Sequence, residues 1–236
     1  MAAARLEPLF LDAHLLAVAK PAGRLVIPGR GAPEPTLQQE LQAEHGRLWV
    51  VHRLDRGTSG VLLFARTAAA HRILNLAFEG REVRKRYLAL VRGLPPEAWR
   101  CEAPLAAGRK GRMKPAAAGD PRGKPSATAF RTVEPLPARE GTGLPDLALV
   151  EASPETGRTH QIRVHLAASG HPLAVDPLYG EAGPLRGARG EVVLDRTPLH
   201  AATLALRHPA SGAGLILEAP LPADLVRALE AARGRG

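Results

Sequence analysis

Cysteine is nearly absent from this 236-residue chain, which contains Cys101 and no other. A single cysteine cannot form an internal disulfide and does not indicate a structural zinc site. Long apolar runs are also missing, and none approaches the roughly 20 residues that a membrane-spanning helix needs. The first ten residues contain charged residues and a proline and lack the apolar core of a signal peptide. We therefore expect no membrane segment and a cytoplasmic location.

Aromatic residues are scarce, at 3% of the chain, whereas positive charge is abundant and confined to one segment. Between Arg81 and Arg131 there are 13 Lys and Arg residues against four acidic ones, so that 13 minus 4 gives the whole net charge of +9. Charge gathered in this way is typical of a phosphate-binding surface. The alternative is a solvated, solubilising face, and we favour nucleic acid.

Within this segment, residues 109–125 are rich in Gly, Pro, Lys and Ala and show no apolar periodicity. They predict a long basic loop, which in a compact domain more often serves a function than not.

Elsewhere, alternating apolar patterns and turn residues predict strands over residues 9–10, 15–19, 49–51, 61–65, 87–91, 127–133, 147–152, 192–194, 203–207 and 215–218. Helices are predicted over residues 36–45, 67–78, 159–169 and 221–233. The first three of these helices begin with a capping threonine and are followed by a glycine. Strands outnumber helices and rarely alternate with them, which favours an α+β fold over a doubly wound one.

The most informative stretch runs from Val51 to Gly60, with the sequence VHRLDRGTSG. It places Asp55 among Arg53, Arg56 and His52, just before a turn. Nearby positive charge favours the ionised form of a carboxylate. Such a group can attack carbon covalently, or it can form one half of a salt bridge that only closes a loop. These ten residues alone leave both interpretations open.

A second dense segment spans residues 156–165, with the sequence TGRTHQIRVH. With Thr159 as the cap, its first helical turn has unpaired N–H groups, which suit an anion. The polar side chains at this turn are Arg158, His160, Gln161 and Arg163. Helical spacing lets Ile162 and Leu166 anchor the helix while Arg163 points at a pocket. The alternative is a turn whose polar groups satisfy one another.

A third segment, Arg84-Lys85-Arg86-Tyr87, leads into a predicted strand. A tyrosine beside cations can stack on a base while the cations hold phosphates. The alternative is an edge-strand aromatic that covers the core. The histidines show no metal-binding spacing, and no glycine motif fits a dinucleotide or phosphate loop. We therefore expect neither a metal nor a cofactor.

Together these motifs resemble those of the RluA-type pseudouridine synthases. The matching segments are His52-Arg53-Leu54-Asp55, Thr58-Ser59-Gly60, Lys85-Arg86-Tyr87, Gly157 to His165, Lys20-Pro21-Ala22-Gly23, Gly170-His171-Pro172, Asp176 to Gly180 and Leu199-His200-Ala201. The match covers nearly the whole chain in the family's order. It implies one α+β catalytic domain over residues 1–236, built on a long mixed, mostly antiparallel sheet, with no separate N-terminal RNA-binding domain.

The implied reaction breaks the glycosidic bond of a uridine in RNA, rotates the uracil and rejoins it to ribose through carbon 5. In the resemblance, Asp55 is the catalytic aspartate, Arg163 pairs with it, and Tyr87 stacks on the uracil and acts as a general base. Asp55 could attack the ribose, attack the uracil or abstract a sugar proton. Arg53 fills the space that the flipped uridine leaves.

The expected partner is ribosomal RNA, transfer RNA or both, bound by a monomer. We expect RNA contacts from His52, Arg53, Thr58, Lys85, Lys110, Lys114, Arg158, His160 and Gln161. Two other interpretations remain, a catalytically idle RNA-binding protein on the same fold and an acid-base hydrolase that acts on RNA or a nucleoside.

Overall fold

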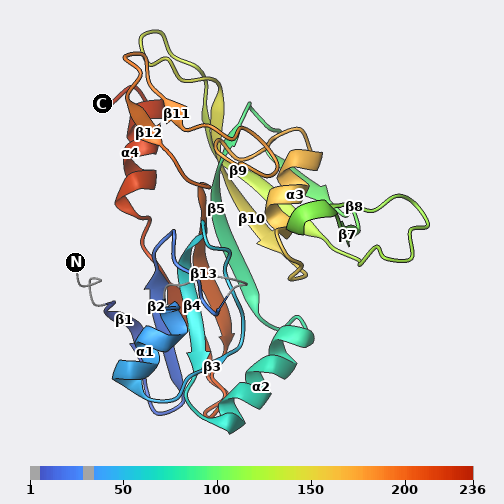
Figure 1. The fold of residues 1–236 in the computed structure, drawn as a ribbon, viewed down its shortest axis with the longest axis vertical. Helices are drawn as coiled ribbons and strands as arrows, with labels where there is room; N and C mark the ends of the chain where they lie inside the picture. The colour runs from blue at the N-terminus through green and yellow to red at the C-terminus, as the bar shows by residue number, and fades with distance from the viewer. Residues whose placement is uncertain (1–5, 29–34, 236) are drawn as a thin grey trace. The chain divides into compact units, whose positions relative to one another are not determined.

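A computed structural model describes residues 6–28 and 35–235 and shows two compact units (Figure 1). The first unit consists of the residues up to Lys85 together with residues 201–220. The second unit consists of residues 86–200 and those from 221 onward. Strands β5 (Arg84–Arg92) and β13 (Leu199–Arg207) carry the chain from one unit to the other. The predicted α+β class is confirmed. One catalytic domain over residues 1–236 stays a prediction.

The sheet of the first unit has the order β1-β2-β4-β13, with β3 on β4 and β14 on β13. Besides β13, its elements are β1 (Pro8–Leu11), β2 (Leu15–Lys20), α1 (Leu37–His45), β3 (Trp49–Val50), β4 (Ser59–Ala65), α2 (Ala68–Glu79) and β14 (Gly214–Glu218). Alternate residues of β2 and β4 face opposite sides of this sheet, as the pleat requires. Leu16 and Phe64 pack with α1, whereas Leu15 and Leu63 belong to the cluster that contains Leu74 of α2.

The sheet of the second unit has the order β5-β10-β9-β6. Besides β5, its elements are β6 (Ala98–Cys101), β7 (Leu105–Ala107), the 3₁₀ turn η1 (Arg109–Gly111), β8 (Met113–Pro115), β9 (Thr128–Leu136), β10 (Leu147–Pro154), α3 (Gln161–Ala168), β11 (Leu185–Arg186), β12 (Val192–Leu194) and α4 (Ala223–Ala232). Figure 1 shows α3 and α4 on opposite sides of β5 and β10. Leu90 clusters with Leu229 of α4, and Val91 clusters with Leu166 of α3.

Two predictions about local structure are wrong. The cap of α3 is His160, in the left-handed region at φ 55°, and not Thr159. Residues 109–125 are not loop throughout, because they contain η1 and β8, and β8 pairs with β7. We call β7, η1 and β8 together the basic hairpin. Its strands have three residues each, which is too short for apolar periodicity to show in the sequence.

Candidate active site

Asp55 lies in a tight turn of the first unit. The N–H of Thr58 donates to the carbonyl oxygen of Asp55 at 3.1 Å, so the turn closes immediately after the carboxylate. Asp55 is partly buried, and the neighbouring Arg53 is exposed. The turn leads directly into β4, whose residues are buried throughout. The segment predicted to carry the chemistry therefore leads directly into a fully buried strand.

Lys20, the last residue of β2, binds the backbone of this turn with its side chain. Its side chain is 1% exposed, and its ammonium donates to the carbonyl oxygens of Pro21, Arg56 and Thr58 at 2.9, 3.2 and 2.8 Å. A buried ammonium needs such acceptors, because charge without hydrogen bonds is costly to bury. The bonds to Arg56 and Thr58 fix the backbone beside Asp55. Lys20 is therefore a positioning residue for the turn.

A second clamp joins Gly23 to the same turn. The N–H of Gly23 donates to the carbonyl oxygen of Arg56 at 2.8 Å, and Nε of Arg56 donates to the carbonyl oxygen of Gly23 at 2.9 Å. At Gly60, where φ is 119°, a Cβ atom would lie 2.2 Å from the carbonyl oxygen of Ala201. Glycine is thus required where the turn enters β4.

His52 serves the interior of the first unit. Its Nε2 accepts the N–H of Leu63 at 3.0 Å, and its ring stacks on Phe78 with a centroid separation of 5.2 Å. Burial and, second, the charge of Lys85 lower the pKa of His52 to about 4. His52 is therefore neutral at pH 7, and we assign it to packing rather than to phosphate binding. Thr58, which is 2% exposed, is likewise enclosed by protein.

Lys85 is a partly buried cation on the same unit. Burial lowers the pKa of its ammonium. Within the described residues, it has no carboxylate within salt-bridge distance. A desolvated ammonium in this setting gains from an anion, which agrees with the predicted RNA contact.

Arg163 lies on α3 in the second unit and is 6% exposed. Its Nε and Nη2 donate to the two carboxylate oxygens of Asp176 at 2.8 and 2.7 Å. Such bidentate pairs fix the plane of the guanidinium as well as its place. Ile162 and Leu166 anchor the helix in the core, as predicted. The sequence did not indicate that Arg163 itself is buried.

The ring of Tyr179 packs against the Arg163 guanidinium. The guanidinium carbon of Arg163 lies 5.0 Å from the centre of the Tyr179 ring, which is within cation–π range. The Tyr179 hydroxyl lies 2.7 Å from Nδ1 of His160 and accepts the N–H of Met113 at 2.8 Å. Tyr179 therefore connects α3 with the basic hairpin.

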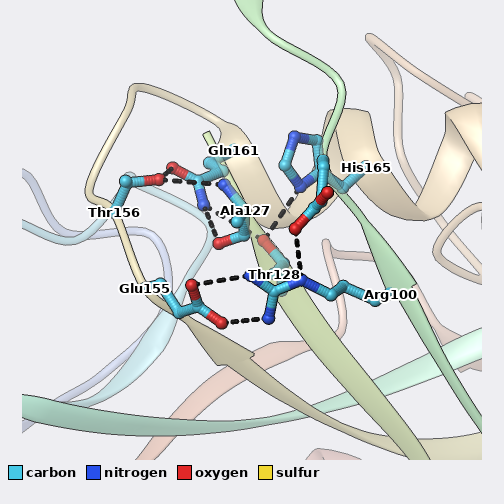
Figure 2. Close-up of polar contacts among 8 residues, drawn as sticks. Arg100, Ala127, Thr128, Glu155, Thr156, Gln161 and His165 are labelled. Atoms are coloured by element: carbon cyan, nitrogen blue, oxygen red, sulfur yellow. Dashed lines mark hydrogen bonds and ion pairs between the residues drawn. The ribbon is translucent and has the colours of Figure 1, made fainter. Parts of the chain in front are cut away.

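Gln161 and His165 bind α3 to the start of β9 (Figure 2). The Gln161 amide accepts from Thr156 and from the N–H of Arg158 and donates to Ala127 and Thr128. All its hydrogen-bonding capacity is used within the protein, so we assign it to positioning α3 rather than to RNA.

His165 is fully buried and belongs to the same group of contacts. Its Nδ1 lies 2.9 Å from the Thr128 hydroxyl, and its Nε2 lies 3.0 Å from the carbonyl oxygen of Ala103. Since Gln161 donates to the Thr128 oxygen, the hydroxyl proton is directed to Nδ1, and Nε2–H donates to Ala103. Burial lowers the pKa of His165, in keeping with this neutral form. This chain of bonds fixes the base of the basic hairpin.

Tyr87 lies on β5 opposite Ala152 of β10 and packs against the cluster that includes Ile162. The second unit thus brings Tyr87 to the sheet face that α3 covers. Arg158 and Lys114 are exposed, and Lys110 lies in η1. Asp55 belongs to the first unit, so its pairing with Arg163 stays a prediction.

Three residues with a positioning role were not predicted as site residues, namely Lys20, Asp176 and Tyr179. All three lie inside sequence motifs on which the family resemblance rests, and their place in those motifs was the signal that could have identified them. Within the described part of the chain, no group of three His, Cys, Asp or Glu side chains is arranged to hold a metal. No described helix has both the length and the apolar character to cross a membrane.

The exposed cations of the basic hairpin are typical of a protein that binds nucleic acid. Residues 14–168 match the model of the RNA pseudouridylate synthase family, and the chain belongs to that family. The predicted RluA-type resemblance is confirmed, as is the isomerase class, since enzymes of this family convert uridine to pseudouridine.

Similar curated proteins include two named ribosomal large subunit pseudouridine synthase D. The one from Nitrosomonas europaea is 41% identical over 97% of this chain and 65% of its own length, and that from Zymomonas mobilis is 38% identical over 93% and 70%. A synthase C from Vibrio vulnificus is 37% identical over 95% and 69%. The chain therefore spans about two thirds of the length of these relatives.

Two human structures share the fold. RNA Pseudouridylate Synthase Domain Containing 4 has a TM-score of 0.73 and 26% identity, covering 96% of this chain and 92% of that one. RNA Pseudouridylate Synthase Domain Containing 1 has a TM-score of 0.71 and 28% identity, covering 92% of this chain and 84% of that one.

Proposed function

We propose that this protein isomerises specific uridines to pseudouridine in ribosomal RNA, with Asp55 as the catalytic carboxylate. The observation that carries the proposal is the turn that presents Asp55, held by hydrogen bonds from buried Lys20 to the carbonyl oxygens of Arg56 and Thr58. A carboxylate that must meet a flipped nucleotide gains rate from being held in place before the substrate arrives. The names of the bacterial relatives favour large-subunit ribosomal RNA as substrate over transfer RNA.

Arg163 and Tyr87 have distinct parts in this proposal. Arg163 pairs with Asp55 and keeps it ionised, and the buried pair with Asp176 supports this role because it fixes the guanidinium plane. Tyr87 stacks on the target uracil and acts as a general base. Asp55 attacks ribose, attacks uracil or promotes a glycal; the same residues serve each route.

The basic hairpin grips the RNA backbone. Arg109, Arg112 and Lys114 are exposed, and within the described residues none of them is paired with a carboxylate. Such side chains neutralise phosphates and release counterions on binding. Arg53, Lys85, Arg158 and His160 are further RNA contacts in this proposal. A cytoplasmic monomer is part of the same proposal, and light scattering of the purified protein tests its monomeric state.

Tritium release tests the reaction directly, because forming the new bond at carbon 5 of uracil expels the hydrogen there. Unmodified large-subunit ribosomal RNA and a transfer RNA pool, both labelled at uracil carbon 5, serve as substrates. We expect release from the ribosomal RNA. No release from either RNA would reject the synthase assignment, and release from transfer RNA alone would reject the proposed substrate.

A further inference from the structure

Tyr179 lies where the basic hairpin, α3 and Arg163 meet. Its ring packs over the Arg163 guanidinium, and its hydroxyl contacts the backbone of Met113, the first residue of β8. These two contacts belong to opposite ends of one rigid side chain, which has only two rotatable bonds. A displacement of β8 therefore acts on the same ring that covers Arg163.

The direction of the hydrogen bonds at Tyr179 follows from its partners. A backbone N–H can only donate, so the Tyr179 oxygen accepts from Met113. The hydroxyl proton then goes to Nδ1 of His160, 2.7 Å away, and His160 carries its own proton on Nε2. His160 caps α3 in the left-handed region, at φ 55°, which is a costly conformation for a residue with a Cβ. The bond from Tyr179 helps to hold this strained start of the helix that carries Arg163.

Asp176 fixes Tyr179 and Arg163 to each other. Its Oδ1 accepts from Nη2 of Arg163 at 2.7 Å and also from the backbone N–H of Leu178 and Tyr179 at 3.0 and 3.2 Å. The loop that bears Tyr179 and the guanidinium are thus held by one buried carboxylate. The hydroxyl end of Tyr179 is held by its hydrogen bonds to Met113 of β8 and to His160.

We propose that Tyr179 is a positioning residue that makes RNA binding by the basic hairpin contribute to the rate of the chemical step. Phosphates held by Arg112 and Lys114 fix β8, β8 fixes the Tyr179 hydroxyl, and the Tyr179 ring, packed over the guanidinium, adds to the hold that Asp176 has on Arg163. The inference rests on the proposed function, since it assigns Arg163 to the reaction.

The kinetic test is a double-mutant cycle on single-turnover rate constants at saturating RNA. Tyr179→Phe removes the hydrogen bonds of the hydroxyl to Met113 and His160 and keeps the ring, so we expect the rate to fall at least about fivefold, the equivalent of one hydrogen bond. Tyr179→Leu also removes the cation–π contact and should lower the rate by a further tenfold or so. Arg112→Gln with Lys114→Gln should slow the wild type severalfold but slow Tyr179→Phe by less than twofold. Independent, multiplying effects would overturn the proposal, as would an unchanged rate in Tyr179→Phe.

Thr132→Val is the matched control. Thr132 lies on β9, and this change removes its hydroxyl, which donates to the carbonyl oxygen of Pro96 at 2.7 Å. We expect its rate to stay within twofold of wild type. Urea unfolding of all the variants shows whether a rate change reflects loss of the fold, and a Tyr179→Phe protein with the wild-type unfolding midpoint keeps the kinetic result decisive.

A second measurement needs no turnover. In the Asp55→Asn background, we expect added RNA to shift the ¹⁵N resonance of Arg163 Nε–H, assigned by its loss in Arg163→Lys. Tyr179→Phe should cut this shift by more than half while RNA affinity changes less than threefold, and an equal shift in both proteins would refute the link. If the wild type releases no tritium but this difference holds, the proposed function fails while the link between hairpin and arginine stands.

Discussion

Asp176 holds Arg163 through two hydrogen bonds of 2.7 and 2.8 Å, and the side chains are only 1% and 7% exposed. Because the pair is buried, water cannot solvate the charge that remains when one partner is removed. Removing one member therefore leaves an uncompensated charge, which is strongly destabilising. The pair is the structural basis of the first prediction.

Asp176→Asn should lower the free energy of unfolding by about 3 kcal/mol or more, because the amide cannot compensate the buried guanidinium charge. It should also slow pseudouridine formation at least tenfold, since Arg163 loses its fixed plane. Urea unfolding and single-turnover tritium release measure the two effects.

Asp224→Asn is the matched control for that variant. Asp224 also binds an arginine, Arg196, through both carboxylate oxygens, but its side chain is 33% exposed. The charge that remains, on Arg196, is 14% exposed and still donates to the carbonyl oxygen of Thr197, so the loss should be smaller, about 1 kcal/mol, with an unchanged rate. Equal losses in Asp176→Asn and Asp224→Asn would contradict the role given to burial.

The features that could be predicted from the sequence are those set by nearby residues. Thr36 and Thr67 cap α1 and α2 as expected, because a cap and its N–H partners are three residues apart. Thr159 looks like a cap by the same rule, yet the chain turns left-handed at His160. Gln161 holds that start of α3 through Ala127 and Thr128, which lie more than 30 residues away.

The candidate site divides in the same way. The motif around Asp55 is visible as a local cluster of charge, whereas the task of Lys20 depends on carbonyl groups 36 and 38 residues further along. Asp176, the partner of Arg163, likewise lies 13 residues further along the chain, beyond the end of α3. Spacing within a helix or strand carries no information about such contacts, so burial and pairing of these side chains needed the structure.

Lys20→Met should destabilise the protein by about 3 kcal/mol, because three backbone carbonyl groups lose a charged donor in a buried place. The turn that presents Asp55 should loosen, and the single-turnover rate should fall at least tenfold. Lys124→Met, on an exposed side chain, is the stability control and should stay within about 0.5 kcal/mol of wild type. A Lys20→Met protein that retains full rate would show that the turn holds its shape without the ammonium.

Asp55→Asn should abolish turnover while RNA affinity stays within about threefold, because the amide keeps the size of the side chain but is a poor nucleophile and base. Tritium release and filter binding measure the two properties separately. Asp195→Asn, which alters an exposed aspartate, should change neither. Turnover near the wild-type rate in Asp55→Asn would remove Asp55 from the mechanism.

Acid should weaken the fold through His52. Its folded-state pKa of about 4 lies below the ordinary value of 6.5, so the unfolded chain binds a proton more readily. Stability from this residue is complete above about pH 6.5 and is lost as the pH falls toward 4, by up to about 3 kcal/mol. His52→Gln keeps an acceptor for Leu63 without a titrating group, and should flatten the unfolding free energy between pH 6.5 and 4. Parallel pH curves for the two proteins would show that His52 remains accessible to water.

Neutralising the basic hairpin should weaken RNA binding most at low salt. Each phosphate contact that Arg112→Gln and Lys114→Gln remove should reduce the slope of log K against log salt by about 0.7 to 0.9. Filter binding from 50 to 300 mM KCl measures this slope. Arg227→Gln removes the same charge from α4, which covers the sheet face opposite α3, and should leave the slope unchanged. Equal slopes for all three variants and the wild type would mean that the hairpin charges face solvent in the complex, because charge that meets no phosphate releases no counterion.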